Sequence, residues 1–108
     1  MEPYSAVVIL ITASTAEEAH RIADTLLKQR KAACVSIVPR VDSLFWWEGK
    51  LDSAAESLLV VKTRASALDE VIKCVKEVHS YRVPEIIAVP IAGGNQDYLE
   101  WIASEVQD

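Results

Sequence analysis

The sequence is poor in the residues that mark disordered, fibrous and disulfide-rich proteins. Its 108 residues include three glycines, four prolines and two cysteines, while about half of the residues are hydrophobic and a quarter are charged. This composition excludes a collagen-like repeat and argues against long disordered segments. A chain of this length forms a single domain with one core.

Long apolar runs and paired cysteines are also lacking. No run approaches the roughly 18 apolar residues that span a bilayer, and residues 1–4 lack the basic start of a signal peptide. Cys34 and Cys74 are too few for a disulfide framework or a Cys-x-x-Cys metal knuckle. We therefore expect a cytoplasmic protein with reduced thiols and no membrane partner.

The charge balance argues against a nucleic-acid partner. The formal net charge is -5, whereas binding to nucleic acid depends on neutralising phosphates. The only basic cluster consists of Lys28, Arg30 and Lys31. It fits the last turn of a helix, where cations favourably oppose the negative end of the helix dipole.

A long hairpin at 32–63 dominates the predicted structure. Two arms rich in β-branched and aromatic residues flank a turn at 47–50. A twelve-residue arm reaches about 40 Å, whereas a sixteen-residue helix beside it covers about 24 Å. The outer half of the hairpin therefore overhangs the domain. Because it carries Phe45, Trp46 and Trp47, we expect this half to form a subunit interface in an oligomer.

The remaining segments predict two strands and three helices. Apolar runs in 5–12 and 85–91 are typical of buried strands. Helical spacing of apolar residues predicts helices at 16–27, 67–78 and 97–106.

Two of these helices have a predicted capping residue. Ser14 stands three residues before Glu17, and Ser66 stands three residues before Asp69. This is the spacing at which a hydroxyl and a carboxylate satisfy each other's backbone donors.

The order β-α-β-β-α-β with a C-terminal helix is the ferredoxin-like plan. It is an α+β fold with an antiparallel four-stranded sheet and helices on one face. We expect the first and last strands, which have the most apolar runs, to lie in or near the middle of the sheet. Partner subunits are expected to cover the open face.

Five motifs cover nearly the whole chain in one order. They are AACVSIVP at 32–39, SLFWWEGK at 43–50, LVVKT at 59–63, HSYRVPEII at 79–87 and DYLEWI at 97–102. Together they resemble the CutA family, the divalent-cation tolerance proteins. The resemblance implies a ferredoxin-like subunit in a tight homotrimer whose hairpins pair across subunits. It also implies tolerance to, and binding of, copper or another divalent cation.

The family's copper ligands carry over poorly. Some members bind copper through a cysteine near the end of the first strand and two adjacent histidines. The matching positions here are Ile11, Val78 and His79. Only His79 is a metal-ligating residue type, so we expect weak copper binding dominated by His79. The alternative is that His79 only places a favourable charge at a helix end.

The family's trimer also resembles the PII signalling proteins, which bind nucleotides between subunits. On that basis the candidate cleft residues are Cys34, Lys62, Tyr81, Arg82 and Glu85. Three of these residues also have a simpler, structural interpretation. Cys34 is then a small buried hydrophobe, Lys62 a strand-end lysine that extends to solvent, and Glu85 a partner in a structural hydrogen bond.

Three functions remain open: a trimeric metal-responsive protein, a PII-like sensor of a small molecule or anion, and a stable trimeric platform for protein interaction. An enzyme is not expected. The sequence shows no nucleophile–base pairing, no phosphate-binding glycine loop and no pair of carboxylates with a definable role.

Overall fold

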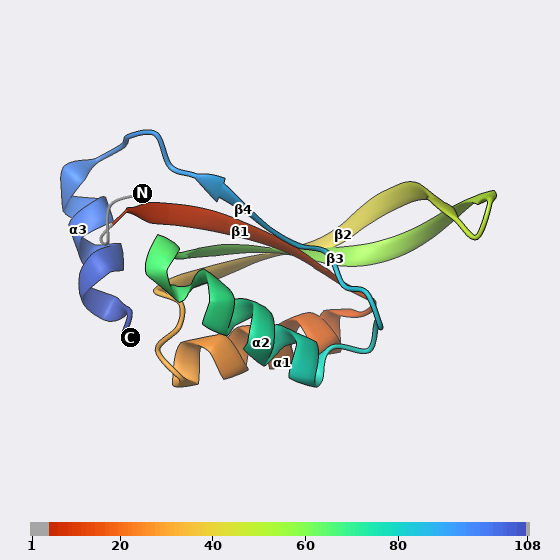
Figure 1. Cartoon of the computed structure of the whole chain (residues 1–108), viewed down its shortest axis with the longest axis horizontal. Coiled ribbons are helices and arrows are strands. Elements are labelled where there is room, and N and C mark those ends of the chain that lie inside the picture. Colours follow the sequence, from red (N-terminus) through yellow and green to blue (C-terminus); the bar gives the residue numbers. More distant parts are fainter. Residues whose placement is uncertain (1–4, 108) are drawn as a thin grey trace.

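The computed structural model describes residues 5–107, which form a four-stranded antiparallel sheet with α1 and α2 on one face (Figure 1). The elements are β1 (Ala6–Ala13), α1 (Ala16–Lys28), β2 (Cys34–Trp47), β3 (Lys50–Arg64), a 3-10 turn (Ala65–Ala67), α2 (Leu68–Val78), β4 (Ile86–Pro90) and α3 (Gln96–Glu105). The predicted α+β fold and element order are confirmed. Residues 1–4, which bear the expectation about a signal peptide, lie outside the described range.

The strand order in the sheet is β2-β3-β1-β4. The first strand, β1, is central as expected. The expectation for the last strand is wrong, because β4 lies at the edge and pairs only with β1. Ile87 and Val89 are 51% and 48% exposed because they lie on the sheet face away from the helices, whereas Ile86 and Ala88 pack against the core. The apolar run of β4 therefore did not indicate a central position within one chain.

The core lies between the sheet and the two long helices. Alternate residues of β1, such as Ile9 and Ile11, point towards the helices and are fully buried. Helix α1 buries Ile22 and Leu26 against them, and α2 adds Val71. Full burial of such a side chain stabilises the fold by about 1.5–3 kcal/mol.

Both predicted helix caps differ from those in the structure. The N-cap of α1 is Thr15, whose Oγ1 accepts a hydrogen bond from the Glu18 N–H at 3.1 Å. The capping pair therefore lies one residue later than predicted. Ser66 belongs to the 3-10 turn, and α2 begins after Ala67 without a side-chain cap. Because the 3-10 turn directly precedes α2, Ser66 lies one residue before the N-cap position, which is Ala67.

The hairpin turn lies at 47–50, as predicted. Trp47 and Lys50 are the last paired residues of β2 and β3, and only Glu48 and Gly49 connect them. Both connecting residues have positive φ, at 50° and 78°. Such a pair is typical of the two-residue turn that matches the twist of the strands.

The hairpin projects well beyond the helices (Figure 1). β1 pairs with β3 only from Ser57 to Arg64, so residues 50–56 and their partners in β2 form a two-stranded ribbon about 23 Å long. The predicted overhang is confirmed. Within the described residues, no helix is long and apolar enough to cross a bilayer.

Candidate functional site

Both faces of the projecting ribbon carry large apolar side chains. Trp46 pairs with Leu51, so these two residues and Leu44 share one face, while Phe45 and Trp47 occupy the other. Leu44, Trp46 and Leu51 are 78%, 70% and 69% exposed. A single chain leaves this patch in water, and such patches mark contact surfaces. The assignment of Phe45, Trp46 and Trp47 to a trimer interface stays a prediction.

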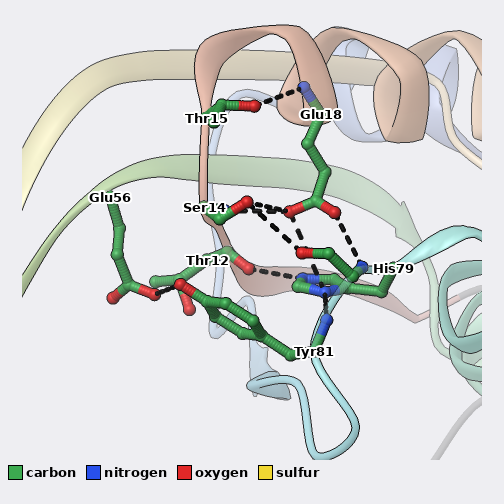
Figure 2. A network of polar contacts seen from close by, with 8 residues as sticks. Thr12, Ser14, Thr15, Glu18, Glu56, His79 and Tyr81 are labelled. Atoms are coloured by element: carbon green, nitrogen blue, oxygen red, sulfur yellow. Dashed lines mark hydrogen bonds and ion pairs between the residues drawn. The ribbon is translucent and has the colours of Figure 1, made fainter.

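A second feature is a buried polar network where β1 ends and α1 begins (Figure 2). At its centre is Glu18, which is 1% exposed. Its Oε1 accepts hydrogen bonds from the N–H and hydroxyl of Ser14, and its Oε2 accepts one from the Ser80 N–H at 2.7 Å. Burial raises the pKa of Glu18, but these hydrogen bonds outweigh it and lower the pKa to about 2.

His79 is held within the same network. Its side chain is fully buried, and its Nδ1 lies 3.9 Å from Glu18 Oε1. Nδ1 accepts a hydrogen bond from the Tyr81 N–H at 3.0 Å, while Nε2 lies 2.7 Å from the Thr12 carbonyl oxygen. These contacts assign a neutral ring with its proton on Nε2, which donates to Thr12.

This geometry sets a condition on the predicted metal role of His79. A metal binds the lone pair of a neutral imidazole nitrogen, and the Nδ1 lone pair is already engaged by Tyr81. Metal binding through Nδ1 would require that hydrogen bond to open. The structure therefore shows a structural role for His79, and ligation stays a prediction.

The other positions of the family's copper site do not supply ligands. Ile11 is fully buried in the core, and Val78 is 39% exposed at the end of α2. Among residues 5–107, no group of three or more His, Cys, Asp or Glu side chains is placed to hold a metal ion. Any metal site formed by residues 5–107 of one chain would therefore have fewer than three such ligands.

Tyr81 connects the network to the hairpin. Its hydroxyl donates to Glu56 Oε2 at 2.8 Å. Burial, followed by the influence of Glu56, raises the pKa of Tyr81 to about 12. Arg82 and Glu85, in the segment that follows, are exposed.

Lys62 and Cys34 lie opposite each other in the β2–β3 register. The Lys62 ammonium group donates to Ser36 Oγ at 2.6 Å and to Cys34 Sγ at 3.7 Å. Cys34 is partly buried rather than enclosed in the core.

The predicted cleft residues therefore form two groups. Tyr81 contacts Glu56, which precedes Lys62 by six residues on the same strand, a separation of about 20 Å. Within one chain, Cys34 and Lys62 do not join Tyr81, Arg82 and Glu85. A single cleft that contains both groups would have to combine two subunits.

Glu18 was not recognised from the sequence. The available signal was the spacing of Thr15 and Glu18, which fits a capping box as well as Ser14 and Glu17 do. Contacts with Ser80, far along the chain, could not be read from local spacing.

Comparison with known proteins gives one consistent result. The family model described as "CutA1 divalent ion tolerance protein" matches residues 7–105. "Protein CutA 1, chloroplastic" of Oryza sativa subsp. japonica is 45% identical over 102 residues, which are 94% of this chain and 58% of that protein. The chain thus spans little more than half of this relative. "Divalent-cation tolerance protein CutA" of Archaeoglobus fulgidus is 48% identical over 99 residues, which cover 92% and 96% of the two chains.

Solved structures agree with these sequence matches. The crystal structure of CutA1 from Oryza sativa has a TM-score of 0.93 at 44% identity and covers 96% of this chain and 95% of its own. The divalent cation tolerance protein from Thermus thermophilus also has a TM-score of 0.93, at 43% identity and with coverage of 94% and 99%. The chain therefore belongs to the CutA1 divalent ion tolerance protein family.

Proposed function

We propose that this protein acts as a homotrimer in the response to divalent metal ions and that it binds copper or a similar cation weakly. The observation that carries the proposal is the family match over residues 7–105. It is joined by relatives named for divalent-cation tolerance, such as the one from Archaeoglobus fulgidus.

Two apolar surfaces support the trimer. One is the ribbon with Trp46 and Leu51, and the other is the sheet face opposite the helices, where Ile87 and Val89 are about half exposed. A second copy of the chain would remove both surfaces from water, which is the main favourable term in association. Sedimentation velocity at micromolar concentration tests the oligomeric state, and a monomer contradicts the proposal.

Weak metal binding follows from the few ligands available. Of the three soft or borderline ligands in the family's copper site, only one has a counterpart here, the imidazole of His79. Both of its ring nitrogens are already engaged in hydrogen bonds. Isothermal titration with copper and with zinc is the direct test.

Substitution of His79 separates ligation from structure. His79→Gln removes the imidazole but keeps an amide donor for the Thr12 carbonyl oxygen. We expect His79→Gln to abolish most copper binding, and Cys34→Ser to change it little. Unchanged binding in a folded His79→Gln protein would place the metal elsewhere. Strong tightening by the pair Ile11→Cys and Val78→His would show that the backbone geometry of the family site is present.

The other two functions stay as alternatives. A PII-like sensor is supported by the cluster around Lys62, whose cation has neutral partners. A protein-interaction platform would show no response to metals or to a panel of nucleotides and small anions.

A further inference from the structure

Lys62 differs from other cations that lie against the body of the protein. The Lys31 side chain is only 13% exposed and is paired with Glu70 at 2.8 Å. Arg30 is paired with Glu105 at 2.6 Å. Lys62, which is partly buried, instead has a hydroxyl and a thiol as partners. Among the described residues, no carboxylate lies within ion-pair distance of Lys62.

The groups around Lys62 are mainly hydrogen-bond donors. An ammonium group has three donors, of which two are directed at Ser36 and Cys34. Because Ser36 Oγ accepts from Lys62, its own proton is available for another acceptor. Ser36 is exposed on β2, the edge of the sheet opposite β4 and its apolar residues, so that acceptor can come from solution.

A third donor comes from α3, which lies at the end of the sheet away from the hairpin tip (Figure 1). Tyr98, in the first turn of α3, is 42% exposed. Burial, followed by the Cys34 thiol, to which the hydroxyl of Tyr98 is hydrogen-bonded, raises the pKa of that hydroxyl. The hydroxyl therefore lies beside Cys34, and its one proton must turn away from the sulfur, a weak acceptor, to reach an anion.

We propose that Lys62, Ser36 and Tyr98 form a binding site for a small oxyanion, such as a phosphate or a carboxylate. Where β2 begins and β3 ends, the Lys62 ammonium group contacts Ser36 and Cys34 and has no carboxylate partner among residues 5–107, and the Tyr98 hydroxyl shares the weakly accepting Cys34 thiol with it. This inference rests on the alternative function, a PII-like sensor of a small molecule or anion, and names the residues that would bind the ligand. It does not depend on metal binding by His79.

Titration followed by nuclear magnetic resonance tests the site. Inorganic phosphate and, in a separate arm, acetate are added to the full chain, with sodium chloride used to keep the ionic strength constant. We expect saturable amide shifts at Cys34, Ser36, Lys62 and Tyr98. The tighter-binding anion identifies the phosphate or carboxylate class. The absence of saturable shifts with both anions overturns the proposal.

Three substitutions assign the donors. Lys62→Gln should weaken binding by about tenfold or more, because hydrogen bonds from a charged donor are roughly twice as strong as neutral ones. Ser36→Ala and Tyr98→Phe should each weaken it by a few fold. Ser36 is exposed, so Ser36→Ala keeps the test valid if Lys62→Gln fails to fold.

The matched control is Lys76→Gln, which removes an equal charge from an exposed position on α2. It should leave anion binding unchanged. Equal weakening by Lys62→Gln and Lys76→Gln would indicate only general electrostatic attraction and would overturn the site. Copper titration of Lys62→Gln should match the unsubstituted protein, so failure of the anion site and failure of the metal proposal give different results.

Discussion

The sequence predicted the roles of single residues only in part, as Glu18 shows. Local spacing indicated a cap near the start of the first helix, but Ser14 and Thr15 fit that spacing equally well. The structure selects Thr15, because Glu18 is buried beneath the 79–81 segment while Glu17 is exposed. Likewise, the predicted cleft residues had suitable chemistry, but only the strand register could show that Tyr81 and Lys62 lie at different ends of the sheet.

The lowered pKa of Glu18 predicts a specific acid sensitivity. Its folded-state pKa of about 2 lies below the ordinary value of 4.5, so its contribution is complete above that value and is lost as pH falls through about 2. Linkage gives about 3 kcal/mol per chain at neutral pH. Urea unfolding at fixed protein concentration, repeated from pH 7 to pH 2, should show Glu18→Gln to be less stable at pH 7 and less sensitive to acid.

Glu17→Gln is the control for this prediction, because Glu17 is the exposed neighbour on the same turn. It should follow the unsubstituted protein at every pH. If Glu17→Gln and Glu18→Gln behave alike, the buried hydrogen bonds do not govern the acid response.

At the scale of elements, periodicity and propensity predicted the four strands and three α-helices of residues 5–107, but not the 3-10 turn at Ala65–Ala67. The hairpin shows a second limit. Its arms follow from β-branched and aromatic residues, but the conformation of its turn depends on the backbone dihedrals of Glu48 and Gly49. The turn at 47–50 was predicted, but the positive φ of Glu48 was not, because glutamate is an uncommon residue in that conformation.

The turn offers a stabilising substitution. Glu48 has a φ of 50°, where an ordinary side chain is strained by about 1–2 kcal/mol and asparagine is better tolerated. Glu48→Asn creates the Asn-Gly pair favoured in two-residue turns. We expect the free energy of unfolding to rise by about 0.5–1 kcal/mol per chain, measured by urea denaturation. Glu48→Val should lower it, and equal stability of the two variants would contradict the assigned turn conformation.

For the whole molecule, the sequence predicted the α+β fold and the order of elements along the chain, but it did not predict the position of β4 in the sheet. The apolar run of β4 suggested burial on both faces, yet within one chain β4 is an edge strand with Ile87 and Val89 about half exposed. An amino-acid pattern records that a side chain is apolar, but not whether its cover comes from the same chain. The exposed residues of β4 and of the hairpin are thus consistent with contact surfaces in the proposed trimer.

Trp46 provides the test of assembly at this scale. It is 70% exposed on the projecting ribbon, so its removal should cost a single chain little, whereas a large aromatic residue at an interface contributes about 2 kcal/mol or more. Trp46→Ala should therefore shift the dissociation of the trimer to higher protein concentration, as measured by sedimentation across a dilution series. Trp101→Ala is the matched control, because Trp101 is 41% exposed on α3, away from the ribbon. If Trp46→Ala assembles as tightly as Trp101→Ala, the ribbon is not the principal contact between subunits.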